Sequence, residues 1–155
     1  MPDPTTEIWF RLFNEVGIIE QLARSRFEAR LPPGFVLAQF TVLNHLIRVR
    51  DGQTPLALAR AFQVPKTSMT HSLAVLERAG LVRLEANPGD GRSKQVWITQ
   101  AGRDFRETAI ATLSQDIAPI AQSIPVAELS ALLPVLERLR KALDAARDSD
   151  GQTPR

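Results

Sequence analysis

Apolar residues recur along most of this chain with the spacing of an amphipathic helix. Residues 5 to about 30 carry the widest apolar stripe. A stripe of this width needs cover on two sides, so the pattern predicts a long first helix that packs against more than one neighbour. The stripe comprises Ile8, Trp9, Leu12, Phe13, Val16, Ile19 and Leu22.

Turn and capping residues divide the next part of the chain into three shorter helices. Residues 31–34 read Leu-Pro-Pro-Gly and end the first helix, since paired prolines remove donors and glycine frees the backbone. A second helix is predicted over Leu37–Val49. Thr54 can cap a short third helix that starts at Pro55. Pro65 then opens a fourth helix, which Gly80 stops.

The apolar period changes to two after the fourth helix. Apolar and polar residues alternate over 82–85 and again over 95–98, which predicts a β-hairpin with Trp97 facing outward. The connection over residues 86–93 consists of turn-forming residues, so we expect a flexible charged loop. Thr99 then caps a helix towards Ser123, and Pro125 starts a last, leucine-rich helix.

This order of elements defines the predicted fold class. It is mainly α with a small β-hairpin wing (α+β). Two short helices joined by a few residues and followed by a hairpin form a winged helix-turn-helix, and long N- and C-terminal helices flank it. Residues 148–155 are polar and predict a flexible tail.

Charge points to a polyanionic partner. The net charge is only +2, but ten basic residues stand against five acidic ones between Arg48 and Arg106. Such a local excess suits nucleic acid, because neutralised phosphates release counterions; a solvated face is the other interpretation.

Several function classes lack the residues that they need. The chain has no Cys, which excludes thiolate metal sites and thiol redox sensing within it, and His45 and His71 lie on different predicted helices without clustered carboxylates. We therefore expect no metal and no cofactor. No glycine-rich phosphate loop or nucleophile motif is present, so we expect no enzyme.

Membrane insertion and secretion are not expected either. No run approaches the roughly 18 apolar residues that a spanning helix needs. The first residues, Met-Pro-Asp-Pro, lack the layout of a signal peptide. The expected location is the cytoplasm.

The fourth helix carries the candidate chemistry. Met69, Leu73 and Leu76 share one side, which should face the core, so the opposite side faces outward. Small hydroxyls, an imidazole and a cation on an exposed helix suit a DNA major groove. The DNA-binding candidates here are Pro65, Lys66, Thr67, Ser68, Thr70 and His71, and Ala74, Val75 and Arg78 continue the same face.

Motifs in the hairpin and the helix-turn-helix resemble those of the MarR family (the multiple antibiotic resistance regulators). The wing motif is Asp90-Gly91-Arg92-Ser93, followed by Val96, Ile98-Thr99, Ala101 and Gly102. The helix-turn-helix motif is Thr54-Pro55, Leu58-Ala59, Met69-Thr70 and residues 76–82. The resemblance spans residues 38 to about 105.

This resemblance implies a homodimeric transcription regulator, expected to be a repressor, that binds double-stranded DNA at a pseudo-palindromic operator. It implies that Arg92 enters a minor groove and that Asp90 orients it, and Lys94 joins the DNA-binding candidates; an ordinary polar turn is the alternative. A narrow minor groove attracts arginine through its concentrated negative potential. Many family members carry arginine where this chain has His71, so the operator sequence does not follow, and His71 could also be simply solvated.

The terminal helices favour dimerisation. Residues 5–30 and 102–145 offer more apolar helix face than the domain between them can cover, and a two-fold dimer is the commonest way to bury it. Leucines at this spacing also occur in monomer cores. The predicted domains are therefore dimerisation helices over 1–36 and 102–147, and a winged helix-turn-helix DNA-binding domain over 37–101.

The resemblance also implies a small aromatic or amphipathic effector in a cleft beside the DNA-binding lobe. The candidate contacts are Phe13, Gly17, Phe40, Asn44 and Arg48. Each of these residues could equally be structural.

A protein–protein adaptor is the alternative function, because fold alone does not prove DNA binding. The polar outward face of the fourth helix argues against an adaptor, which would present apolar anchors. An outward Trp97 is the one residue that favours it.

Overall fold

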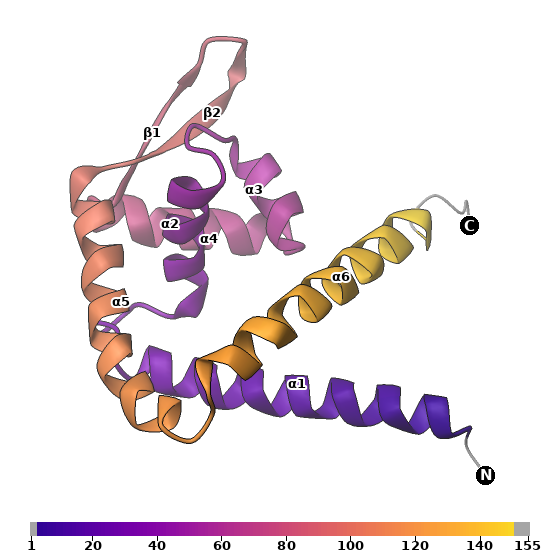
Figure 1. The fold of residues 1–155 in the computed structure, drawn as a ribbon. Coiled ribbons are helices and arrows are strands. Elements are labelled where there is room, and N and C mark those ends of the chain that lie inside the picture. The colour runs from indigo at the N-terminus through magenta and orange to yellow at the C-terminus, as the bar shows by residue number, and fades with distance from the viewer. Residues whose placement is uncertain (1–2, 151–155) are drawn as a thin grey trace. The chain divides into compact units, whose positions relative to one another are not determined.

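The structure, a computed structural model, describes residues 3–150. Over these residues it forms six helices and one two-stranded antiparallel sheet, in the mainly α order predicted from the sequence (Figure 1). The elements are α1 (Pro4–Glu28), α2 (Leu37–Arg48), α3 (Pro55–Phe62), α4 (Lys66–Arg78), β1 (Val82–Asn87), β2 (Asp90–Ile98), α5 (Gln100–Ala121) and α6 (Val126–Asp150).

The chain divides into two compact units, of which the first ends at Leu113 and the second begins at Ser114. α5 is continuous across this boundary. The predicted tail, 148–155, lies partly outside the described residues. Among those residues no single helix is long and apolar enough to cross a membrane, and α5 and α6 meet that test only together, as a bent pair.

Local capping explains the helix-turn-helix. The Thr54 hydroxyl accepts a hydrogen bond from the Ala57 amide at 3.2 Å, which confirms the predicted cap of α3. α3 ends at Phe62, and the next residue, Gln63, has a left-handed φ of 54°. Glycine usually occupies this conformation at the end of a helix. The Val64 amide then donates to the Ala59 carbonyl at 3.0 Å, so the chain turns tightly into α4.

The main core of the first unit lies between α2, α3, α4 and the sheet. Met69, Leu73 and Leu76 are all buried there, as their spacing predicts. The other buried members are Val42, Leu43, Leu46, Leu58, Ala59, Leu81, Val82, Val96 and Ile98. The helix-turn-helix therefore rests on a continuous apolar base, which holds the outward face of α4 in place.

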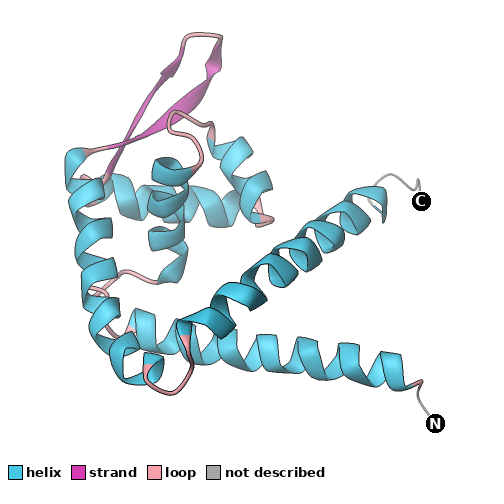
Figure 2. Ribbon diagram, in the orientation of Figure 1, coloured by secondary structure: helices cyan, strands magenta, loops and turns pink. Residues whose placement is uncertain are grey.

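The hairpin, called the wing from here, projects beyond helices α2–α4 (Figure 2). Its connection corrects the prediction of a long flexible loop over residues 86–93. β1 continues to Asn87 and β2 starts at Asp90, while the pairing shifts between Ala86–Lys94 and Asn87–Asp90. The tip is therefore a two-residue turn followed by a bulge over residues 91–93.

Side-chain hydrogen bonds explain why this tip is ordered. Asn87 accepts from the Gly89 amide at 3.0 Å and donates to the Ser93 hydroxyl at 2.9 Å. The same hydroxyl donates to the Asp90 carbonyl at 3.2 Å. The polar turn residues thus bond to one another, so the composition typical of a loop here builds a closed turn.

α1 contacts the rest of the first unit mainly near its C-terminal end. Phe27 is its buried residue, and the ring packs against Phe40 with centroids 4.5 Å apart. Leu31 and Ala109 complete this second small cluster. Most other apolar side chains of α1 are exposed within the single chain, including Phe10 at 74%.

Candidate nucleic-acid interface

α4 presents the polar face that the sequence predicts. Lys66, Thr67, Ser68, Thr70 and His71 are all exposed, on a helix whose other side is fixed in the core. Such a helix holds its outward side chains at fixed positions. It can therefore offer hydroxyl, imidazole and ammonium groups to a groove without first having to order.

The start of α4 is open to an anion. Pro65 is the residue that precedes the first helical turn, and no side chain caps this helix start. Backbone N–H groups at an uncapped start point along the helix axis and favour negative charge. The Thr70 hydroxyl donates to the Lys66 carbonyl at 2.8 Å, which leaves its oxygen as an acceptor for a base edge.

The wing brings a second set of candidates together. Arg92 and Lys94 are exposed on β2 near the tip. The Asp90 carboxylate accepts a hydrogen bond from the backbone N–H of Arg92 at 3.0 Å. Asp90 therefore fixes the backbone from which the Arg92 side chain leaves, and it acts on the arginine through that backbone.

Trp97 does not face freely outward, which corrects the prediction for this residue. The residue is partly buried, and its Nε1 is buried without a hydrogen-bond partner in the described chain. A Cβ added to Gly52 would lie 2.6 Å from the indole, so the ring covers this glycine directly. The side chain on which the adaptor alternative depended is thus packed at the base of the wing.

The effector candidates fall into three separate places. Asn44 and Arg48 share a surface pocket of about 400 Å³ with Thr41, His45, Val49 and Phe62. Phe40 belongs to the small core around Phe27. Phe13 is exposed and stacks on Trp9 at 5.9 Å, and Gly17 is exposed with open space around it. Within one chain Asn44 and Arg48 share a pocket, whereas Phe13 and Gly17 lie one turn apart on the exposed surface of α1.

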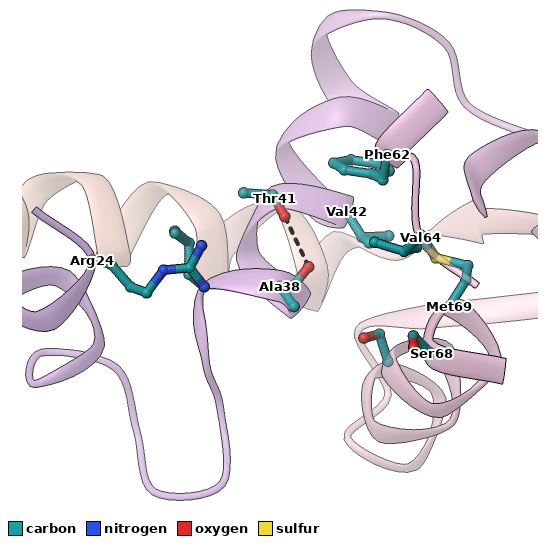
Figure 3. A pocket seen from close by; sticks show the side chains of 10 residues that line it. Arg24, Ala38, Thr41, Val42, Phe62, Val64, Ser68 and Met69 are labelled. Carbon is teal, nitrogen blue, oxygen red and sulfur yellow. Dashed lines mark hydrogen bonds between the residues drawn. The ribbon is translucent and has the colours of Figure 1, made fainter. Parts of the chain in front are cut away.

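A second pocket, of about 340 Å³, opens between α2 and α4 (Figure 3). Ser68 and Met69 of α4 face Val42 across it, and Arg24 reaches its rim from α1. Leu37, Ala38, Thr41, Phe62, Val64 and Ser72 complete the lining. Ser68 thus lies on the outward face of α4 and also borders a cavity beneath it.

The sequence does not predict two groups of polar contacts in this region. Asp51 binds the backbone of β2 and Arg103, and Asn44 binds Arg106. Each pair joins residues far apart in the chain, and helical periodicity carries no signal for such pairs. The one available hint is an acidic residue directly before a glycine at a helix end, as Asp51 stands before Gly52.

Comparisons with known proteins agree with this geometry. A family model described as MarR family matches residues 34–93, which include α2–α4 and most of the wing. The transcriptional regulator HosA of Escherichia coli O111:H- is 30% identical over 100 residues, which are 64% of this chain and 73% of that protein.

Solved structures show the same fold. The transcriptional regulator BldR from Sulfolobus solfataricus superposes with a TM-score of 0.74 at 23% identity, covering 93% of this chain and 99% of that one. A mutant of MarR from E. coli, complexed with operator DNA, superposes with a TM-score of 0.71 at 24% identity, covering 89% and 99%. The fold is that of a winged-helix regulator, and the chain belongs to the MarR family of transcriptional regulators.

Proposed function

We propose that this regulator acts as a homodimer on a pseudo-palindromic operator, as a repressor that a small aromatic or amphipathic effector releases. Residues 37–101 read the DNA, and the helices of residues 1–36 and 102–147 hold the dimer together. The observation that carries the proposal is the exposed polar face of α4, held on a rigid core beside a wing with two cations near its tip.

α4 is the proposed major-groove reader. Thr67, Ser68 and His71 offer donors and acceptors to base edges, while the helix start and Lys66 suit phosphates. The related MarR mutant complexed with operator DNA shares this fold, which supports the assignment.

The wing is the proposed minor-groove contact. Arg92 is exposed beyond a turn that Asp90 and Asn87 hold together, so its guanidinium leaves from a defined backbone position. Minor grooves that are narrow attract arginine. Lys94, on the same strand, adds a phosphate contact in this proposal.

Exposed apolar side chains support the dimer. Within α1 they include Ile8, Phe10, Ile19 and Leu22, each more than half exposed. The described part of the second unit, considered separately, exposes Val126, Leu129, Leu132, Leu133, Val135 and Leu143. This many large exposed apolar side chains are rare on monomers and favour an interface.

The same proposal includes a small-molecule effector, a cytoplasmic location and the absence of enzymatic activity. The pocket around Asn44 and Arg48 offers the amide nitrogen of Asn44, a cation and the Phe62 ring to a small amphipathic molecule. A regulator of this kind works in the cytoplasm, where its operator is, and alters transcription by occupying DNA, without a chemical step.

The test is a titration of purified protein against two labelled duplexes of equal length. One duplex carries the intergenic sequence beside the protein's own gene, and the other a scrambled sequence. We expect tighter binding to the intergenic duplex, and a loss of roughly 10³ to 10⁵ in affinity between about 50 and 200 mM salt. Light scattering on the same samples should give the mass of a dimer.

Two variants sharpen this test. Arg92→Ala should weaken binding to the intergenic duplex. Arg140→Ala removes an exposed cation paired with Asp144 on α6, and at protein concentrations at which it is a dimer it should leave binding unchanged. If neither duplex binds at low salt, the proposed DNA binding is wrong and the result favours the protein–protein adaptor. If binding is tight but Arg140→Ala weakens it as much as Arg92→Ala, the wing has no special role.

A further inference from the structure

Asp51 occupies the junction of three elements at the base of the wing. It lies in the turn that follows α2, and its side chain is mostly buried, at 24% exposure. One carboxylate oxygen, Oδ1, accepts from the Gly52 amide and from the Ile98 amide, both at 3.0 Å. The other, Oδ2, lies 3.6 Å from the Arg103 guanidinium on α5. A single carboxylate thus links the end of α2, the end of β2 and the start of α5.

The turn that carries Asp51 also pairs with the free edge of β2. The Gly52 amide donates to the Val96 carbonyl at 3.0 Å, and the Val96 amide donates to the Gln53 carbonyl at 2.9 Å. The Trp97 ring lies directly over Gly52 and leaves no room for a side chain there, and the φ of 69° at this residue is left-handed, which also favours glycine. The base of the wing is therefore held by this turn on one side and by β1 on the other.

The direction of the wing depends on this base. A two-stranded hairpin is marginally stable by itself, so it takes its orientation from what anchors it. At about 3.3 Å per residue, the strand from Ile98 to Arg92 spans roughly 20 Å, so a tilt of about 10° at the base moves the tip by about 3 Å. A shift of that size takes a guanidinium out of hydrogen-bond range.

We propose that Asp51 is a positioning residue for DNA binding: together with Arg103 it sets the angle of the wing, and so places Arg92. Arg103 stands one turn into α5, the helix that continues into the second unit. This ion pair therefore joins the start of α5 to the base of the wing. The inference rests on the proposed DNA-binding function and adds residues that neither α4 nor the wing tip contains.

Two substitutions separate the ion pair from the backbone contacts. Asp51→Asn keeps a side-chain oxygen that can accept from the Gly52 and Ile98 amides, but it removes the charge that faces Arg103. Arg103→Gln removes the same pair from the other side. We expect each to weaken binding about tenfold to the duplex that wild-type protein selects from a random-sequence pool, the loss typical of one charge-assisted contact.

The decisive readout is a double-mutant cycle with Arg92→Ala. If Asp51 acts by placing the wing arginine, Asp51→Asn weakens binding in the wild-type background but has little further effect once Arg92 is gone. A purely structural role would weaken binding equally in both backgrounds, and that result would overturn the inference. The single variant Arg92→Ala tests the proposed function of the wing by itself. If it does not weaken binding, the proposed minor-groove contact is wrong, whatever the effect of Asp51→Asn.

Trp97 provides a second measurement that does not involve DNA. Trp9→Phe leaves Trp97 as the sole tryptophan of the chain. In this background we expect Arg103→Gln to red-shift its emission as the indole gains water, with unchanged far-ultraviolet circular dichroism. An unshifted emission with weakened DNA binding would contradict an effect through the wing base. Should Asp51→Asn fail to fold, Arg103→Gln completes both measurements alone.

Discussion

Arg106 on α5 donates two hydrogen bonds, from Nε and Nη2, to the one side-chain oxygen of Asn44 on α2, at 3.1 and 3.0 Å. The arginine side chain is only 17% exposed, and it also pairs with Glu107. This contact joins residues 62 positions apart in the sequence and fixes the start of α5 against α2. Asn44 is one of the candidate effector contacts, and its side-chain oxygen is engaged inside the protein.

Arg106→Ala should lower the free energy of unfolding by about 2 kcal/mol, because it leaves the half-buried Asn44 oxygen without its charged donor. The measurement is urea denaturation at a fixed protein concentration, since a dimer's apparent stability depends on concentration. Arg83→Ala is the control, because it removes an exposed pair with Glu85 on β1 and should change stability by less than about 0.5 kcal/mol. Equal losses in the two variants would contradict this reasoning.

Gly102→Ala should destabilise the first unit strongly. A Cβ at this position would clash with the Leu81 carbonyl oxygen, which already accepts from the Thr99 amide at 3.1 Å and so is held in place. We expect a loss of about 1–3 kcal/mol from this overpacking. Gly91→Ala is the matched control, since nothing lies within 4 Å of its Cβ, and it should be close to neutral. A thermal melt that ranks the two glycines in the opposite order would refute the close approach.

Thr54→Ala should destabilise α3 by about 1 kcal/mol, because it leaves the Ala57 amide without its cap. Thr54→Ser keeps the hydroxyl and should retain most of the stability. Urea denaturation of both variants separates the cap from the methyl group. If the two substitutions lower the free energy of unfolding by the same amount, the hydroxyl does not contribute to stability.

Much of the fold could be predicted from the sequence because its signals are local. Thr54, Pro55 and Gly80 mark helix ends through the chemistry of single turns, and the spacing of Met69, Leu73 and Leu76 identifies the buried face of α4. The exposed residues on the other face, the candidate readers, follow from the same period. Both structure and family comparison confirm the mainly α winged architecture.

The predictions that were wrong depend on contacts that periodicity does not carry. Trp97 alternates out of phase with Val96 and Ile98, so it is predicted to face outward, yet the turn at Gly52 lies beneath its ring. The residues of the wing tip look like a flexible loop because each favours turns, but Asn87 and Ser93 bond to each other and close the strand ends. In both cases the position of the side chain depends on a partner residue, and the local sequence pattern does not identify that partner.

The salt dependence of binding should distinguish a phosphate contact at Lys94 from a general effect of charge. Lys94→Ala removes an exposed ammonium on β2, so it should weaken binding to all duplexes similarly and reduce the slope of log K against log salt by about 0.9, the value for one phosphate. Lys141→Ala changes the net charge by the same amount at an exposed site on α6, outside the proposed DNA interface, and is compared at protein concentrations at which both variants are dimers. Its slope should match that of the wild type. If both variants lower the slope equally, overall charge governs binding and Lys94 makes no phosphate contact; if Lys94→Ala changes sequence preference, it reads bases.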